Sequence, residues 1–597
     1  MFQFLYIIVL VLFAQSCGHL DFKNKNRTPV DIKKESFQPV SEWQNFQNQY
    51  FNKLWSLDTN YPAYLGHPKY EFQLKAYDHQ KNKTMVQFYQ KYLALLKNYK
   101  IEKLNSNEKI EHKLLQNGIE SSIWYSIYFK SYETNPSHIN AANVIGEVWN
   151  SSQKSTDQKL ELISLLLENV PAYYEASFAA LRTSSKEHLN LAIKQNKGSI
   201  SFLNSTFNGS LLKTNKSIEF VKKFNINLSL AVQATEKHVE NLESMNKRLK
   251  KNNSFKSFRI SKKEYAQKFK FEMQTVKSAD QIYQSAIAAK KQTHQKMFLI
   301  SEKLWPKYFP GIQPPKDQIK MTSQLIEKIS LKHSTVEEIL PNIRKQIPEL
   351  WNFVLKKDLM TLDESQPLEV RETPIYKQGF AGASVDSPGI FEVQGKTYYN
   401  VTPPTQLSKE RQESYLREYN DYMMKILNIH EAIPGHYVQL VYSNKNSSLV
   451  KKLLQSGTMM EGWAVYTERM MLEEGFGNQE PELWLMYYKW FLRVTCNTIL
   501  DYSIHNLNMT KVQAEDLLMN QAFQERTEFE EKWNRATYSQ VQLSSYFAGF
   551  TEIYDYREKL KKKLGSRFSL KKFHEKFLSY GSIPVKMIIE LMDQEGF

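Results

Sequence analysis

Apolar residues recur every three to four positions along most of the chain from residue 41 to the C-terminus. This spacing places them on one face of an α-helix, and it therefore predicts a succession of amphipathic helices. The predicted helical stretches are 108–130, 157–183, 217–250, 262–304 and 316–363, with further helices from 408 to the end.

Residues 371–404 depart from this pattern because they hold much of the chain's Gly and Pro. Within them "GIFEVQGKTYYNV", at 389–401, predicts a β-hairpin that turns at 394–396. The expected fold is mainly α, a large multi-helix body with a small β hairpin or sheet near the active site. The breaker cluster "WPKYFPGIQPP" separates an N-terminal helical region, 41–304, from a catalytic region, 305–597. We expect the two to form one intertwined body.

Composition agrees with a helical globular protein. The 597 residues are 41% hydrophobic and include only 20 Gly and 20 Pro, which favours long helices over a turn-rich β fold. The net charge of +16 comes from dispersed lysines, and no nucleic-acid motif accompanies it. The charge therefore indicates solvated helix faces, with an anionic surface or substrate as the alternative, and we expect no nucleic-acid partner.

The N-terminus carries an export signal. "MFQFLYIIVLVLFAQSC" contains an apolar run too short to span a bilayer, followed by small residues and Cys17, and it resembles a bacterial lipobox. We expect residues 1–17 to be a lipoprotein signal peptide, Cys17 to be lipidated and 18–40 to be a flexible tether. The protein would then be an exported, membrane-anchored lipoprotein, periplasmic or outer-membrane facing. A plain secretory signal is the alternative.

The stretch "HEAIPGH", residues 430–436, resembles the zinc motif H-E-x-x-H, but its two histidines are six positions apart. In a regular helix, His436 would lie about 120° around and about 9 Å along the axis from His430, too far for one Zn²⁺. Pro434 and Gly435 are the residues able to distort the backbone there. We therefore expect the helix to break at 433–435 and the two imidazoles to converge.

A zinc site needs a third protein ligand, and a catalytic site also needs an open position and a base. Glu431 follows His430 directly and is the expected general base. Glu461 lies 25 residues after His436, far enough for a second helix, capped by Thr458, to return beside the first, and it is the expected third ligand. Glu468 is either a residue that orients a ligand imidazole or an exposed charge near Arg469.

Two motifs together carry a family resemblance. "HEAIPGHYVQ" followed by "EGWAVYTERM" resembles the HExxPGH family of bacterial, often lipoprotein-anchored, proteins catalogued as domain of unknown function 885 and grouped with gluzincin-like metallopeptidases. The resemblance begins at 61–73 and continues to the C-terminus. It implies a metallopeptidase-like helical body, a zinc site of two His and one Glu, and hydrolysis of peptide-like substrates.

The same resemblance extends to "RVTCNTILDYSIHNLNMT" and "NRATYSQVQLSSYFAG". The matching positions are Arg493, Asp501, His505, Arg535, Gln542, Tyr546 and Gly549. The family's Tyr after the Arg is Ala536 here, and its Pro-Gly is Gln540-Val541.

Acyl hydrolysis develops an oxyanion that needs a hydrogen-bond donor, and Tyr546 and His505 are the candidates. Arg535 or Arg493 would hold a substrate carboxylate, with Gln542 also contacting substrate. Asp501 is expected to support a functional side chain from behind. The alternative is that these are buried structural residues.

The sequence thus predicts a zinc-dependent hydrolase, a membrane-tethered metallopeptidase of carboxypeptidase or dipeptidase type. Its expected cofactor is Zn²⁺ and its partners are a peptide-like substrate and a membrane, through Cys17. Two alternatives remain open at this stage: an amidase or deacylase acting on small or cell-wall substrates, and a non-catalytic metal-binding lipoprotein.

Overall fold

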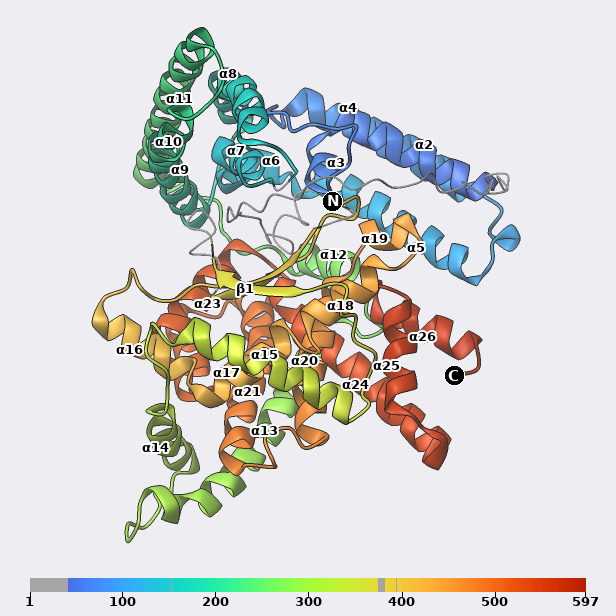
Figure 1. The fold of residues 1–597 in the computed structure, drawn as a ribbon, viewed down its shortest axis with the longest axis vertical. Coiled ribbons are helices and arrows are strands. Elements are labelled where there is room, and N and C mark those ends of the chain that lie inside the picture. Colours follow the sequence, from blue (N-terminus) through green and yellow to red (C-terminus); the bar gives the residue numbers. More distant parts are fainter. Residues whose placement is uncertain (1–40, 152, 374–381, 393–394) are drawn as a thin grey trace, which may run out of the picture.

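The protein is a mainly α-helical body with one small sheet (Figure 1). The structure, a computed structural model, describes residues 41–151, 153–373, 382–392 and 395–597. The predicted signal peptide, tether and lipidation site Cys17 lie outside the described residues. No helix in the described part of the chain is both long and apolar enough to cross a membrane.

The first half of the chain is a run of helices. They are α2 Glu42–Leu57, α3 Asn60–Tyr64, α4 His79–Lys97, α5 Ser106–Trp124, α6 Ser131–Thr134, α7 Ala141–Asn150, α8 Thr156–Ala180, α9 Lys186–Thr206, α10 Asn208–Leu211, α11 Ile218–Lys251, α12 Lys262–Met273 and α13 Ala279–Tyr308. The predicted helices at 157–183 and 217–250 are confirmed within a few residues at each end. The predicted stretch at 262–304 is helical but contains two helices, because the chain breaks after Met273 where Gln274 is left-handed, and Ser278 caps a new helix.

The second half carries further helices. They are α14 Gln318–Ser330, α15 Ile339–Lys356, α16 Lys409–Glu418, α17 Asp421–Glu431, α18 His436–Asn444, α19 Leu449–Leu453, α20 Gly457–Glu473, α21 Pro481–Asn506, α22 Lys511–Glu515, α23 Arg526–Tyr538, α24 Ser545–Leu564, α25 Leu570–Ser579 and α26 Val585–Gln594. Thr458 does not cap α20 as predicted. Ser456 precedes the helix, and the Thr458 hydroxyl instead donates to the carbonyl of Met273, 3.1 Å away.

Three strands form the sheet in the order β1-β3-β2. They are β1 Leu368–Glu372, β2 Ala383–Asp386 and β3 Thr397–Val401; β1 runs parallel and β2 antiparallel to β3. The predicted hairpin is correct for β3 but wrong for its partner, because residues 390–391 form a turn and 383–386 supply the strand. The buried Tyr399 hydroxyl donates to Asn428 Oδ1 (2.8 Å), which attaches the sheet to α17 beside the site.

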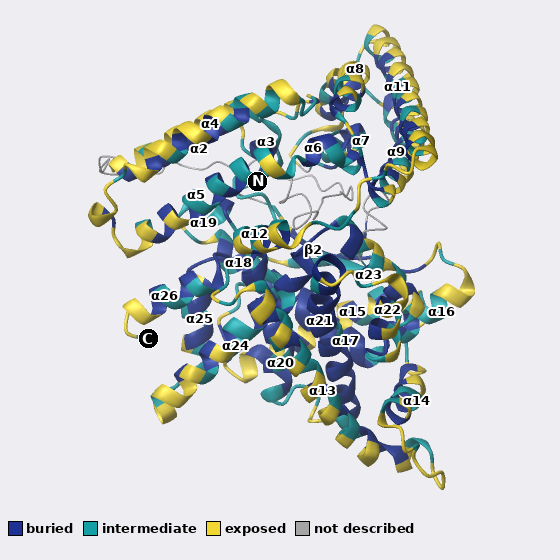
Figure 2. Ribbon diagram, turned by 180° about the vertical axis from the view of Figure 1, so that it is seen from behind, coloured by how far each residue is buried: buried dark blue, intermediate teal, exposed yellow. Residues whose placement is uncertain are grey.

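One hydrophobic core joins both halves of the sequence. It runs from Trp43 in α2 to Met592 in α26, so regions 41–304 and 305–597 pack into a single body. A separate core binds α7, α8 and α11 into a lobe at one corner of the molecule (Figure 1). Figure 2 shows that α17, α20 and α21 are buried along most of their length in the centre of the main body. The candidate functional residues lie on these central helices.

Two glycines allow α20 and α24 to cross closely. A Cβ on Gly549 would lie 1.8 Å from the Thr458 carbonyl oxygen, and one on Gly462 would lie 2.4 Å from the Gly549 carbonyl carbon. Only residues without a side chain fit such an approach. The crossing brings Glu461, next to Gly462, to the same place as Tyr546, one turn before Gly549.

Candidate metal centre

The helix break predicted at 433–435 is confirmed. Helix α17 ends at Glu431 and α18 begins at His436, with residues 432–435 in a turn between them. Gly435 is required there because a Cβ would lie 1.8 Å from the His430 carbonyl oxygen. The indole Nε1 of Trp463 donates to the Pro434 carbonyl at 2.9 Å, so the second motif holds the turn of the first.

This turn brings three metal-ligating side chains together. The Nε2 atoms of His430 and His436 lie 3.7 and 3.5 Å from Glu461 Oε2. One ligand atom from each residue lies within 4.8 Å of the others. Tetrahedral zinc with bonds of about 2.05 Å needs ligand atoms about 3.3 Å apart, so a small side-chain adjustment would close the set. Two imidazoles and one carboxylate suit zinc chemically.

The electrostatics of the cluster favour a cation. Burial lowers the pKa of His430, but hydrogen bonds to Glu461 and Glu468 outweigh it and raise that pKa to about 10. Burial raises the pKa of Glu461, but hydrogen bonds to His430 and His436 bring it far below its usual value. These buried carboxylates therefore stabilise positive charge between them, which a divalent cation would supply in place of protons.

Glu468 fixes the orientation of His430. His430 Nδ1 lies 2.6 Å from Glu468 Oε1, and the Trp490 indole donates to the same oxygen at 2.9 Å. With its Nδ1 proton bound to a carboxylate, the imidazole presents a bare Nε2 to a metal. Glu468 is fully buried, so the alternative of an exposed charge near Arg469 is wrong.

Glu431 is buried at the end of α17, directly after a ligand histidine. No residue that the structure describes donates a hydrogen bond to its carboxylate. A carboxylate in this position is free to accept a proton from water near the ligand set.

Tyr546, Arg535 and Gln542 line the same centre. The Tyr546 ring stacks near the His430 ring, with centroids 6.5 Å apart. Arg535 Nη2 donates to the Tyr546 hydroxyl (3.0 Å) and to Gln542 Oε1 (2.8 Å). Burial raises the pKa of Tyr546 to about 12; Arg535 opposes the rise, and Glu461 adds to it. The phenol therefore keeps its proton and can donate a hydrogen bond.

His505 and Asp501 lie away from the three ligand side chains. His505 Nδ1 faces the Ile260 amide at 3.4 Å, its ring stacks on Tyr265, and Nε2 lies 3.8 Å from Asp501. Burial lowers the pKa of His505 to about 3. No hydrogen bond, ion pair or ring contact among the described residues joins His505 to the three ligand side chains, so its role as an oxyanion donor stays a prediction.

Asp501 supports a loop rather than a metal ligand. Its carboxylate accepts from the Tyr265 hydroxyl (2.9 Å) and from the Val541 amide (3.1 Å). Val541 has φ of +75°, a strained angle for a β-branched residue, at the position where the resemblance places a Gly. Asp501 therefore holds the turn from which Gln542 and Tyr546 project.

Arg493 is already paired. Its Nη2 lies 2.6 Å from Glu528 Oε1, and its guanidinium covers the Trp490 ring at 4.8 Å. Burial lowers the pKa of Arg493, but the neighbouring Glu528 and Tyr419 have the larger combined effect and raise this pKa. Arg493 thus packs on the Trp490 ring, and the Trp490 indole donates a hydrogen bond to Glu468.

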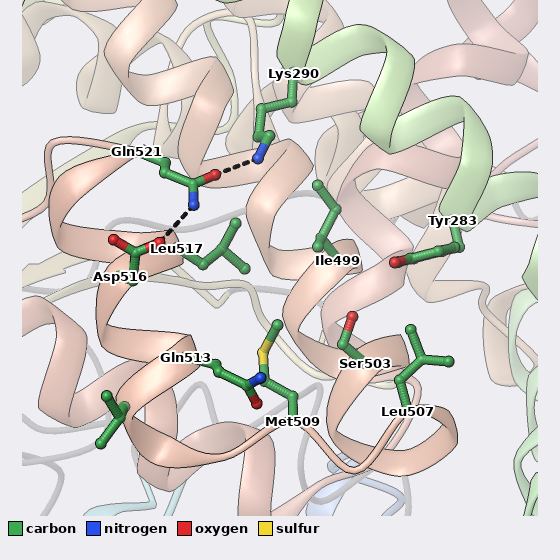
Figure 3. A pocket seen from close by; sticks show the side chains of 11 residues that line it. Tyr283, Lys290, Ile499, Ser503, Leu507, Met509, Gln513, Asp516, Leu517 and Gln521 are labelled. Carbon is green, nitrogen blue, oxygen red and sulfur yellow. Dashed lines mark hydrogen bonds between the residues drawn. The ribbon is translucent and has the colours of Figure 1, made fainter. Parts of the chain in front are cut away.

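A separate cavity of about 490 Å³ lies further along α21 (Figure 3). Its lining includes Tyr283, Lys290, Ser503 and Asp516. Ser503 is 13 residues from Trp490 on one helix, or about 20 Å away. This cavity is therefore not part of the candidate metal centre.

The sequence did not predict that Trp490 contacts Glu468 or that Trp463 donates a hydrogen bond to the Pro434 carbonyl. The signal for Trp463 was present, since it stands two residues after Glu461 in the second motif. Nothing in the local sequence marked Trp490, because its contact with Glu468 depends on the packing of α20 against α21.

A family model described as "Bacterial protein of unknown function (DUF885)" matches residues 61–592. The chain belongs to this family. The DUF885 chain is 45% identical to a candidate lipoprotein of unknown function from Shewanella oneidensis, with a TM-score of 0.82 over 92% of this chain and 100% of that one. The resemblance to domain of unknown function 885 is thereby confirmed, whereas the grouping with gluzincin-like metallopeptidases stays a prediction.

The same fold occurs in a candidate lipoprotein from Colwellia psychrerythraea. That structure is 17% identical to this DUF885 chain, with a TM-score of 0.76 over 93% of this chain and 99% of that one. At this identity the likeness shows the fold alone. None of the curated proteins compared with the chain matches it.

Proposed function

We propose that this DUF885 protein is a zinc-dependent hydrolase that cleaves peptide bonds. The observation that carries the proposal is the convergence of His430, His436 and Glu461, with the unpartnered Glu431 carboxylate beside them. Three protein ligands leave one position for water or substrate, whereas structural zinc sites normally have four. This count favours a hydrolase over a non-catalytic metal-binding protein.

In the proposed acyl hydrolysis each residue around the ligand set has a separate role. His430, His436 and Glu461 would hold zinc, which would supply Lewis acidity and would lower the pKa of water. Glu431 takes a proton from the attacking water and later gives it to the leaving amine. Tyr546 keeps its proton and donates a hydrogen bond to the oxyanion that develops on the substrate. Glu468 holds His430 in the orientation that exposes Nε2.

Zinc content is the first test. Wild-type protein should bind about one zinc ion per chain, and His430→Ala and Glu461→Ala should each lose it. Stoichiometric zinc in both variants would rule out this ligand set.

Peptide turnover is the second test. Glu431→Gln should keep zinc but lose at least about 100-fold in turnover of a peptide library, since general bases contribute about 10²–10⁴-fold. Glu364→Gln, an exposed glutamate far along the chain from the motif, is the matched control and should behave as wild type. Full activity in Glu431→Gln would remove the proposed base.

We further propose that the protein is an exported lipoprotein anchored through Cys17. The N-terminal sequence supports this, as does the description of the Shewanella oneidensis relative as a candidate lipoprotein. Labelling with a fatty-acid analogue should mark wild type but not Cys17→Ser, and the variant should leave the membrane fraction. A Cys17→Ser protein that stays labelled and membrane-bound would contradict the anchor.

A further inference from the structure

A guanidinium without a carboxylate partner lies beside the candidate metal centre. Arg535 Nη2 donates to Gln542 Oε1 and to the Tyr546 hydroxyl, and both acceptors are neutral. No residue that the structure describes places a carboxylate oxygen within 4.0 Å of Arg535. Its Nε and Nη1 donors have no partner among the described residues, and the side chain is only half-buried. These donors therefore remain available to a ligand bound beside Tyr546 and Gln542.

Arg493, the other candidate, differs on each of these points. Its guanidinium is held by Glu528 at 2.6 Å and lies 3.9 Å from Glu418, and the Tyr419 hydroxyl accepts from it at 3.3 Å. A substrate carboxylate would have to displace Glu528, at the cost of breaking a buried ion pair. Of the two arginines, only Arg535 lacks a carboxylate oxygen within 4.0 Å among the described residues.

Arg535 also lies at a useful distance from the reacting atoms. Tyr546 lies between Arg535 and Glu461, and both neighbours act on its pKa. Two hydrogen-bond lengths put the guanidinium about 6 Å from the Glu461 carboxylate. One residue of extended peptide spans about 3.5 Å, so a carboxylate one residue beyond a bond at the zinc would reach Arg535.

The charges behind Arg535 reinforce its preference for an anion. Lys532, one turn earlier on α23, is buried and lies 3.5 Å from Glu528, which it shares with Arg493. Burial and the neighbouring Arg493 lower the pKa of Lys532 to about 7. Arg493 and Lys532 thus share the carboxylate of Glu528, whereas Arg535 has no carboxylate oxygen within 4.0 Å among the described residues.

We propose that Arg535 binds the free α-carboxylate of the substrate, so that the enzyme removes single residues from peptide C-termini or splits dipeptides. Gln542 orients the guanidinium through its Oε1, which leaves Nη1 to donate a charge-assisted hydrogen bond to the substrate carboxylate. This inference rests on the proposed hydrolase function, which it makes specific for a substrate class.

The test compares two peptide pools of identical sequences, one with free C-termini and one with C-terminal amides. Zinc-loaded Glu431→Gln protein is dialysed against each pool, and the retained peptides are quantified by mass spectrometry. We expect the free-carboxylate pool to be retained about tenfold or more over the amide pool, since a hydrogen bond between two charged groups contributes at least that much. In Glu431→Gln/Arg535→Gln this preference should vanish, and with Arg535→Lys it should be partly restored.

Turnover and zinc content separate the possible failures. Wild type should cleave the free-carboxylate pool about tenfold faster or more, and Arg535→Gln should equalise the two pools with its zinc intact. Arg526→Gln, an exposed arginine on the same helix, is the matched control. Equal retention of both pools, no retention, or an equal loss on both in Arg535→Gln would overturn the proposal. Cleavage of neither pool with carboxylate-dependent retention would instead overturn the hydrolase function alone.

Discussion

Replacing Glu468 by glutamine tests how strongly the hydrogen bond between Glu468 and His430 Nδ1 controls metal binding. The carboxylate is fully buried and accepts from both His430 Nδ1 (2.6 Å) and Trp490 Nε1 (2.9 Å). The glutamine side chain can still accept through its Oε1, but it lacks the charge that strengthens the bond. Its amide nitrogen would take the place of Glu468 Oε2, which has no hydrogen-bond partner, and so would be a buried donor without an acceptor.

The magnitude follows from these contacts. A hydrogen bond to a charged group contributes about 1.5–3 kcal/mol, and loss of such a partner to a ligand histidine lowers metal affinity about 10- to 100-fold. We therefore expect the zinc Kd of Glu468→Gln to rise by about 10- to 100-fold, or about 1.4–2.7 kcal/mol. The free energy of unfolding of the metal-free protein should also fall, because the variant removes the carboxylate from a buried pair with His430.

The assay is competition for zinc against a chelator of known affinity, at one pH and one salt concentration. Denaturant unfolding of the metal-free protein runs alongside it. Glu474→Gln, at the half-buried C-cap of the same helix, is the matched control and should bind zinc as wild type does. An unchanged zinc Kd in Glu468→Gln would refute the reasoning.

Three further predictions follow from the backbone around the site. Gly435→Ala should abolish stoichiometric zinc, measured by elemental analysis, because its Cβ would lie 1.8 Å from the His430 carbonyl oxygen. Gly549→Ala should lower the free energy of unfolding by about 3 kcal/mol in denaturant titration, because its Cβ would overlap the Thr458 carbonyl; an effect below about 0.5 kcal/mol would contradict the crossing. Asp501→Ala should reduce kcat at least about tenfold with zinc retained, because the Val541 amide loses its acceptor and the turn that presents Tyr546 loosens; full activity would mean that Asp501 does not position this turn.

The parts of the site that lie close together in sequence could be predicted. The break at 433–435 followed from helix geometry, since two histidines six positions apart cannot face one metal unless the helix is distorted. Glu461 lies 25 residues after His436, which is far enough for a second helix to return beside the first, and it stands within a distinctive motif. In each case the physical constraint acted within about 30 residues, a range in which periodicity and backbone angles carry the information.

The parts that depend on distant packing could not be predicted. His505 and Arg493 have the residue types of functional groups, but α12 surrounds the first with Tyr265, and α23 supplies Glu528 to the second. The break between α12 and α13 could not be predicted, because apolar residues continue at helical spacing on both sides of it. The β1 strand, which pairs with a strand far along the chain, β3, gave no local turn signal.

The crossing of α20 and α24 at Gly462 and Gly549 has a consequence for how the protein could be altered. One helix carries Glu461 and the other carries Tyr546, so a single interhelical spacing sets the position of both groups. A substitution that moves the helices apart would shift the metal ligand and the hydrogen-bond donor together. Variants with altered substrate range are therefore best sought in side chains that leave this spacing fixed, such as those of the 540–542 turn, while both glycines stay unchanged.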